Sequence, residues 1–297
     1  MKLLLPTDGS DYSEGAARFL AHLAFTGDDE ITVLHVINWV PFKDDVESHY
    51  ASLKKIKQEI APKILDATVD ILQPLHAKIS TAVIEGSPDK SIVEAAVTGG
   101  VDLIVMGARG LKGIRQLIIG SVTRSVALGS PVPVLVVKPP QFEVSPKLHI
   151  LFATDGSEYA TAAARLLAAL PFPPDSEVTV VNVVRSATAD IPERLYLEIG
   201  DQVKEDVAKA RAIEYAESEK VLEPAVGLLK GRFPNVHGIT RVGDPSIEIL
   251  TLSEELRTAV IVTGCRGLKG VKGKLGGVSR NVLRHSHCSA LIARTCG

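Results

Sequence analysis

The sequence has few cysteines, almost no net charge and no apolar run long enough to cross a bilayer. Its three cysteines, Cys265, Cys288 and Cys296, lie in the second half without a regular spacing, which favours reduced thiols. A net charge of −2 gives no electrostatic reason to expect nucleic acid as a partner. Because Met1–Pro6 leads directly into a strand pattern, we expect a cytoplasmic protein with no signal peptide and no membrane association.

Recognisable catalytic sets are also missing. No Ser-His-Asp set and no pair of carboxylates stands out from the ordinary composition of a protein surface. His285, His287 and Cys288 could hold zinc, but they lack the paired spacing of a structural zinc site and stand where the last predicted helix turns into a strand. We therefore expect no metal bound by protein ligands alone.

The chain does contain an internal repeat. The TDGS tetrapeptide at Asp8 returns at Asp155, an offset of 147 residues (155 minus 8), and later segments return at an offset of 157 (Gly264 minus Gly107). The repeat predicts two domains, 1–140 and 147–297, joined by a short proline-rich linker near 139–146. The matching segments are 3–23 with 150–170, 31–38 with 178–185, 101–113 with 258–270, and 130–138 with 286–294.

Each copy alternates short apolar strands with amphipathic helices, the pattern of a parallel sheet covered by helices on both faces. The fold class is therefore α/β, with two tandem doubly wound domains of five parallel strands each. We predict that Ser10 or Asp11 caps the first helix, that Pro88 opens the third, and that Pro62 kinks or breaks the second. In the first copy the strands are expected near 2–6, 31–37, 77–84, 102–106 and 132–138, and the helices near 11–26, 46–73, 88–99 and 120–129.

The second copy has a longer helical stretch, near 192–230, which accounts for its ten extra residues (157 minus 147). Apolar residues recur along this stretch at helical spacing, so we expect them to face the core rather than a lipid groove. They are Ile199, Val203, Val207, Ala210 and Ile213.

The functional prediction starts from a glycine-rich loop that follows the strand 102–106. Gly107 and Gly110 carry no Cβ, so a ligand can approach the main chain closely. Gly120 and Ser121 then open a helix whose unpaired N–H groups, dipole and serine hydroxyl suit an anion, and a phosphate group best. Positive charge is added nearby by Arg109, Lys112 and Arg115.

The spacing of this loop, G-2x-G-9x-G-S, fits neither a P-loop nor a dinucleotide fingerprint, and a connection that binds nothing is the alternative for an isolated loop. In an open parallel sheet, ligands bind outside the carboxyl ends of the strands. Pro6–Asp8 and His35–Asn38 end the first two strands, so they should lie beside the loop. Asp8 can hold a ribose hydroxyl or a divalent cation, or else cap the first helix, and the Val36 backbone can contact a base edge.

On these residues the chain resembles the universal stress protein family in its tandem two-domain form. The segments that carry the resemblance are PTDGS, LHVIN, Gly86-Ser87-Pro88, DLIVMGARG, the glycine spacing and SPVPVLVV. It implies an adenine-nucleotide hydrolase-like fold with strand order 3-2-1-4-5, ATP binding, and a role in stress survival or regulation rather than rapid catalysis. It implies that adenosine is held by Pro6, Thr7, Asp8, Val36 and Met106, and the phosphates by Gly107, Arg109, Gly110, Gly120, Ser121 and Val122.

The second copy departs from this pattern in three places. Ala153 replaces Pro6, Thr263 replaces Met106, and Gly277 stands where Ser121 stands in the first copy. Loss of the serine hydroxyl weakens a phosphate site that consists mostly of backbone N–H groups, so we expect weaker binding there. By position, the second site is formed by Ala153, Thr154, Asp155, Val183, Thr263, Gly264, Arg266, Gly267, Gly276, Gly277 and Val278.

Three functions remain open. The favoured one is an ATP-binding regulator, with Mg²⁺ or Mn²⁺ on the phosphates as an open question. The second is a slow ATPase or a nucleotidyl or phosphoryl transferase, which is less favoured because no positioned base or metal-holding acid is found beyond Asp8. The third is a nucleotide-free interaction protein. If nucleotide binds, Gly107→Val or Gly120→Val should abolish binding while the protein stays folded.

The last strand of each copy, 132–138 and 289–294, is expected at a sheet edge, where unpaired backbone groups invite another strand. Pro133 fits an edge better than a sheet centre. We predict that these two strands pair within the chain, and the resemblance points the same way because single-domain members of the family dimerise through this strand. A further homodimer of the whole chain is left open, and no protein partner is identified.

Overall fold

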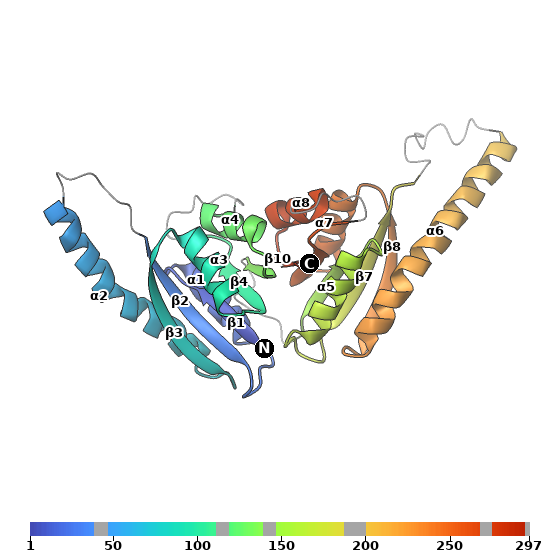
Figure 1. Cartoon of the computed structure of the whole chain (residues 1–297). Helices are drawn as coiled ribbons and strands as arrows, with labels where there is room; N and C mark the ends of the chain where they lie inside the picture. The colour runs from blue at the N-terminus through green and yellow to red at the C-terminus, as the bar shows by residue number, and fades with distance from the viewer. Residues whose placement is uncertain (39–46, 111–118, 139–146, 187–199, 268–274, 295–297) are drawn as a thin grey trace. The chain divides into compact units, whose positions relative to one another are not determined.

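The computed structural model describes residues 1–38, 47–110, 119–138, 147–186, 200–267 and 275–294 (Figure 1). These residues form two compact units. The first unit holds the described residues up to 138, together with 171–173 and the segment that begins at His287. The second holds 147–170 and 174–286. The repeat places the final segment in the second domain instead, so the domain boundaries drawn from the sequence stay a prediction.

The first unit contains a parallel sheet in the order β3-β2-β1-β4-β5, as the resemblance implies. Helix α1 packs against α2, and α3 against α4, so each face of the sheet receives one pair of helices. The strands are β1 (Lys2–Pro6), β2 (Glu30–Asn38), β3 (Lys78–Gly86), β4 (Leu103–Gly107) and β5 (Val134–Val137), and the helices are α1 (Asp11–Leu20), α2 (Glu47–Leu72), α3 (Pro88–Thr98) and α4 (Ser121–Gly129).

The second unit repeats this arrangement with parallel strands in the order β9-β6-β7-β8. Helix α5 packs against α6, and α7 against α8. The elements are β6 (His149–Ala153), α5 (Glu158–Ala169), β7 (Glu177–Val184), α6 (Asp201–Lys230), β8 (Asn235–Val242), α7 (Pro245–Glu255), β9 (Val260–Gly264) and α8 (Gly277–His285).

The predicted pairing of the final strands is confirmed. Strand β10 (Ser289–Ala293) runs antiparallel to β5, with Ala290 opposite Val136 and Ile292 opposite Val134. The side chains of these four residues are completely buried, so β5 is covered by backbone and by apolar side chains of the chain's own last segment.

Local signals in the sequence explain how several helices begin. The Ser10 side chain accepts a hydrogen bond from the Ser13 N–H at 3.3 Å, so Ser10 is the N-cap of α1, one of the two predicted candidates. Pro88 is the first residue of α3, as predicted. Pro62, however, lies inside α2 without ending it, so the predicted break is not found.

The prediction that an apolar stripe on the long second helix faces the core is wrong for two of its residues. The side chain of Val203 is 45% exposed and that of Ile213 is 64% exposed. The buried residues of α6 lie further along it, at Ser218, Leu222 and Leu229. Helical spacing identifies a face of a helix, but it does not show which part of a long helix reaches the sheet. Val207 and Ala210 are half-buried, and Ile199 lies outside the described residues.

Candidate functional site

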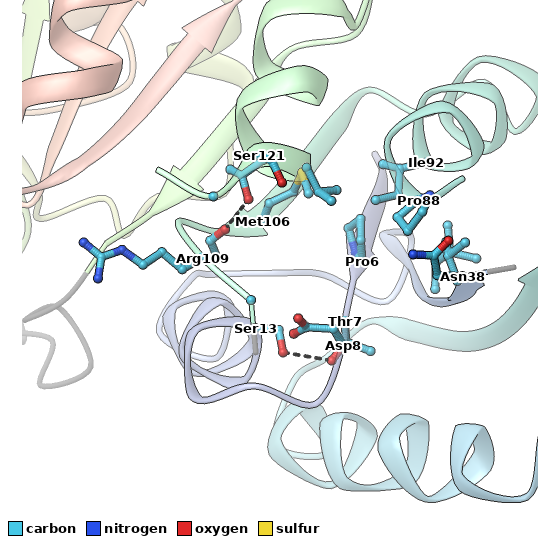
Figure 2. Close-up of a pocket in the computed structure, with 17 residues that line it drawn as sticks. Pro6, Thr7, Asp8, Ser13, Asn38, Pro88, Ile92, Met106, Arg109 and Ser121 are labelled. Carbon is cyan, nitrogen blue, oxygen red and sulfur yellow. Dashed lines mark hydrogen bonds between the residues drawn. The ribbon is translucent and has the colours of Figure 1, made fainter. Parts of the chain in front are cut away.

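A cavity of about 400 Å³ opens in the first unit at the carboxyl ends of β1, β2 and β4 (Figure 2). Its volume is in the range of small-molecule sites. All eleven residues predicted for the first site line it, namely Pro6, Thr7, Asp8, Val36, Met106, Gly107, Arg109, Gly110, Gly120, Ser121 and Val122.

Six further residues line the same cavity and were not among the predicted ligand contacts. They are Ser13, Leu34, Asn38, Pro88, Ile92 and Thr123. Asn38 belongs to the segment His35–Asn38 that the sequence pattern places beside the loop, and Pro88 could have been found because it opens a helix that follows a strand. Ser13, Ile92 and Thr123 lie within helices, and only the packing of those helices brings them to the cavity.

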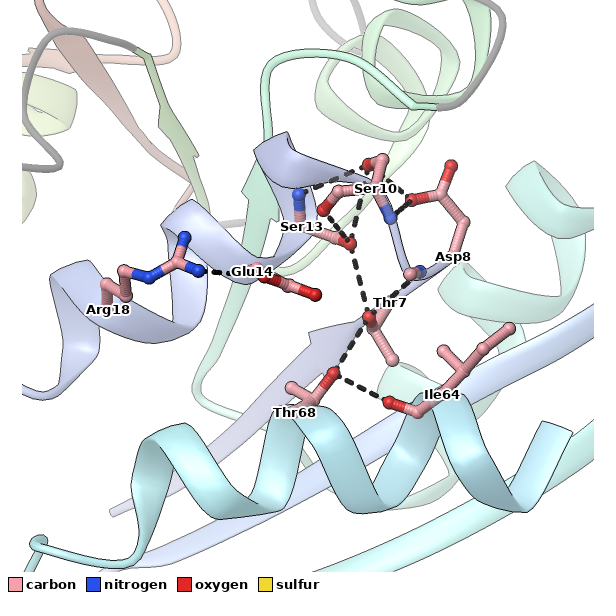
Figure 3. Close-up of polar contacts among 9 residues, drawn as sticks. Thr7, Asp8, Ser10, Ser13, Glu14, Arg18, Ile64 and Thr68 are labelled. Atoms are coloured by element: carbon pink, nitrogen blue, oxygen red, sulfur yellow. Dashed lines mark hydrogen bonds and ion pairs between the residues drawn. The ribbon is translucent and has the colours of Figure 1, made fainter. Parts of the chain in front are cut away.

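The end of β1 is fixed by buried hydroxyl groups (Figure 3). The Thr7 Oγ1 atom lies 3.2 Å from Ser13 Oγ and 3.1 Å from Thr68 Oγ1, and Thr68 donates to the Ile64 carbonyl at 3.0 Å. On its other side, the Thr7 carbonyl lies 2.9 Å from His35 Nδ1. These contacts tie β1 to α1, α2 and β2, so the main chain that carries Asp8 has a defined position in the site.

The Asp8 carboxylate shapes the turn before α1. Its Oδ1 atom accepts hydrogen bonds from the Ser10 N–H at 3.1 Å and from the Ser10 hydroxyl at 2.6 Å. A Cβ atom on Gly110 would collide with Oδ2, so the loop passes directly over the carboxylate. The alternative that Asp8 itself caps α1 is therefore wrong, because Ser10 has that role and Asp8 faces the loop.

Helix α4 begins at the edge of the cavity. Its N-cap, Gly120, supplies no side-chain hydrogen bond, and Ser121 and Val122 of the first turn line the cavity. Two hydrogen bonds hold this turn against the end of β4: Gly120 N–H to the Ala108 carbonyl at 2.9 Å, and the Thr123 hydroxyl to the Gly107 carbonyl at 2.9 Å. The first-turn N–H groups are therefore placed to receive an anion.

Arg109 also lines the cavity, but its charged end is directed elsewhere. Figure 2 shows the side chain extending away from Asp8 and Ser121. The guanidinium carbon lies 5.6 Å from the centroid of the Tyr12 ring, and Nη1 lies 3.4 Å from the Tyr12 hydroxyl oxygen. In this structure Arg109 thus presents its main chain rather than its charge to the site. Lys112 and Arg115 lie outside the described residues.

The second unit reproduces the framework of the loop. The Gly276 N–H donates to the Cys265 carbonyl at 2.8 Å, and the Ser279 hydroxyl donates to the Gly264 carbonyl at 2.6 Å. A Cβ atom on Gly267 would collide with Asp155, as one on Gly110 would with Asp8. The backbone features of the predicted second site are therefore present.

The walls of the predicted second site differ from those of the first. Thr263, at the position of Met106, is 3% exposed, and its hydroxyl has no hydrogen-bond partner among the described residues. A cavity of about 210 Å³ in this unit lies between α5 and α6, and Thr154 is its one lining residue that also belongs to the predicted second site. This cavity is therefore not the equivalent of the one in the first unit, and the second site stays a prediction.

Neither Cys265 nor Cys288 forms a disulfide, and Cys296 lies outside the described residues. Among the residues that the structure describes, no group of three or more His, Cys, Asp or Glu side chains could hold a metal ion. The described helices also include none with the length and apolar character needed to cross a membrane.

Both units are doubly wound α/β domains, and the first combines a glycine-rich loop with a helix N-terminus at the carboxyl ends of its strands. This is a class of fold that binds small ligands at that edge of the sheet. The family model described as "Universal stress protein family" matches residues 1–138 and again residues 148–294, in agreement with the tandem organisation predicted from the repeat. The chain therefore belongs to the universal stress protein family.

Individual relatives support the same assignment. A universal stress protein of Methanocaldococcus jannaschii is 34% identical over 143 residues, which are 48% of this chain and 84% of that protein. A universal stress protein of Mycolicibacterium smegmatis is 24% identical over 302 aligned positions, covering 98% of this chain and 96% of the relative. The crystal structure of a universal stress protein from Archaeoglobus fulgidus has a TM-score of 0.63 at 24% identity, covers 99% and 98% of the two chains, and shares the fold.

Proposed function

We propose that the first unit binds ATP and that the protein is a nucleotide-dependent regulator of a stress response. The observation that carries this proposal is the single cavity around which Pro6–Asp8, Val36, the glycine-rich loop and the start of α4 meet. The family resemblance supports ATP as the nucleotide. A cytoplasmic location and a homodimer of the whole chain are further parts of the proposal, and sedimentation of the purified protein tests the second.

The two ends of the cavity suit the two halves of a nucleotide. Pro6, Leu34 and Met106 are buried apolar residues that can contact a base, while Asp8 can accept hydrogen bonds from ribose hydroxyls. The first turn of α4 offers backbone N–H groups and the Ser121 hydroxyl to the phosphates. Phosphate oxygens and water would coordinate Mg²⁺ or Mn²⁺ there, and the Asp8 carboxylate would be the protein group that supplies a further oxygen.

A regulator is favoured over an enzyme because the described lining of the cavity offers too few carboxylates for phosphoryl transfer. Among the described residues that line the cavity, Asp8 is the only acidic one, and its Oδ1 atom is already used by Ser10. Phosphoryl transfer needs positioned groups for the nucleophile and the metal, which one such carboxylate does not supply. A slow ATPase is the alternative, and turnover of ATP in the presence of Mg²⁺ separates the two.

Gly120→Val should lower the affinity for ATP by about 100-fold or more, because its side chain would occupy the space in which the phosphates meet the α4 N-terminus. Isothermal titration calorimetry with ATP measures the effect. Gly120→Ala is the graded variant, because its Cβ would lie 3.4 Å from the Arg109 Cα, an ordinary contact. Unchanged ATP affinity in a folded Gly120→Val protein would contradict the site assignment.

The same substitution in the second unit, Gly276→Val, should leave the tighter ATP binding event unchanged. The two glycines have matched surroundings, since a Cβ on Gly276 would lie 3.5 Å from the Arg266 Cα. The comparison uses the whole chain, because β10 belongs to the sheet of the first unit and would be lost from an isolated half. If Gly276→Val removes the tighter of the two ATP binding events, the second site has the higher affinity, which is the reverse of the prediction.

A further inference from the structure

Tyr12 contacts the glycine-rich loop through both its main chain and its side chain. Its carbonyl group lies so close to Gly107 that a Cβ atom there would collide with it. Its ring lies 5.6 Å from the Arg109 guanidinium carbon, and its hydroxyl oxygen lies 3.4 Å from Arg109 Nη1. One residue in the first turn of α1 therefore holds both ends of the segment 107–109.

This segment leads to the groups that face the proposed phosphate position. Gly110 follows this segment and lies directly over the Asp8 carboxylate. Within the segment, the Ala108 carbonyl accepts a hydrogen bond from the Gly120 N–H at 2.9 Å. The path of the loop is thus set by α1 on one side and by the start of α4 on the other. A change in the position of Arg109 would therefore move residues 109 and 110, both of which line the cavity.

We infer that Tyr12 is a positioning residue for nucleotide binding. By holding the Arg109 side chain against α1, it fixes the loop backbone that receives the phosphates, and the Arg109 charge serves this contact rather than the phosphates. The inference rests on the proposed function for the identity of the ligand. The contact itself combines ring and cation stacking with a hydrogen bond, and the stacking contributes more when the groups are partly buried, as both are here.

The second unit contains the same arrangement. The Arg266 guanidinium carbon lies 4.6 Å from the centroid of the Tyr159 ring, and a Cβ on Gly264 would lie 3.0 Å from the Tyr159 carbonyl oxygen. The wall residues of the two predicted sites differ, as Met106 and Thr263 show, yet this contact is present in both units. The contact between tyrosine and arginine is therefore a feature of the loop in both units, and it does not depend on the residues at the end of the site proposed for the base.

The test compares Tyr12→Leu with Tyr12→Phe in the full chain, using calorimetry with ATP and with adenosine. Tyr12→Leu should lower ATP affinity roughly tenfold while adenosine affinity stays the same, because only the phosphates contact the loop. Tyr12→Phe keeps the ring and should bind ATP nearly as the parent does. Tyr159→Leu is the matched control in the second unit and should leave the tighter ATP binding event unchanged.

A double variant separates positioning from direct contact. If Arg109 acts only through Tyr12, adding Tyr12→Leu to Arg109→Leu should weaken ATP binding no further. Additive losses would overturn the inference, since they would mean that Arg109 has its own contact with the phosphates. Unchanged ATP affinity in Tyr12→Leu, or an equal loss of adenosine affinity, would overturn it as well.

Hydrogen exchange of the ligand-free protein gives a measurement that does not depend on the nucleotide. The amides of residues 108–110 should exchange faster in Tyr12→Leu than in the parent, and at the parental rate in Tyr12→Phe. Equal exchange in all three proteins would show that Tyr12 does not hold the loop. If the parent binds neither ATP nor adenosine, the proposed function fails, and exchange alone decides whether the contact positions the loop.

Discussion

Gly107→Ala is expected to lower the free energy of unfolding of the first unit by about 3 kcal/mol or more. The added methyl group would collide with the Tyr12 carbonyl and lie 2.9 Å from the Ser13 nitrogen, both of which are backbone atoms of α1. Because β4 is buried along its whole length, neither the strand nor the helix can shift without disturbing the core. A Gly107 variant is therefore expected to lose stability as well as nucleotide binding.

Thermal unfolding followed by circular dichroism measures this loss of stability. It corresponds to a fall of about 10 °C in the unfolding temperature for a unit of this size. Gly120→Ala is the matched control, because its new methyl group would meet nothing closer than 3.4 Å. It should unfold within about 2 °C of the parent. If the two alanine variants unfold at the same temperature, close packing of β4 on α1 is not the reason for a glycine at residue 107.

Lys138→Met is expected to stabilise the protein at pH 7 by about 3 kcal/mol. Lys138 ends the segment that contains β5, and it is 6% exposed. Burial lowers its pKa to about 8, a shift that the nearby Cys288 opposes and the nearby Arg109 reinforces. Methionine has a similar length and no charge, so it should occupy the same space without the cost of burying an ammonium group.

The pH dependence gives this prediction its specific test. The pKa of Lys138 is about 8 in the folded protein and about 10.5 in an unfolded chain, so the folded state releases the proton first. The stability of the parent should therefore rise, relative to the variant, as the pH increases from about 8 to about 10.5. Below pH 8 both states carry the proton, and the full cost of burial is present.

Urea unfolding of the two proteins at pH 7 and pH 10 measures the difference. The gap in stability should be largest at pH 7 and should shrink at pH 10. A gap that is independent of pH would mean that Lys138 is not the group responsible. The Lys138 N–H also donates to Ser289 Oγ at 3.2 Å, but this backbone contact is available in both proteins and should cancel.

Several features were predictable from the sequence because they depend on neighbouring residues. The Ser10 cap, Pro88 at the start of α3 and the alternation of apolar strands with helices are all local, and the structure has each of them. The grouping of site residues was predictable for a related reason. The carboxyl ends of parallel strands meet at one edge of a sheet, so Asp8, Val36 and the loop after β4 had to lie near one another.

The pairing of the last two strands was predictable from the same kind of reasoning. Each ends its copy of the repeat, and an edge strand has unpaired backbone groups that another strand can cover. The register of this pairing could not be predicted from the sequence, because many alignments of two short apolar strands bury similar side chains. That Ala290 lies opposite Val136 required the tertiary structure.

The sequence by itself determined the fold class, the tandem organisation and the place of the candidate site, since these follow from periodicity, repetition and strand ends. Only the tertiary structure decided what each side chain does there. It places the guanidinium of Arg109 on Tyr12, the carbonyl of Tyr12 against Gly107, and Ile213 at the surface of α6. The two Tyr12 contacts join residues far apart in the chain, and the exposure of Ile213 depends on where the sheet ends beneath α6. Neither leaves a local pattern in the sequence from which it could be predicted.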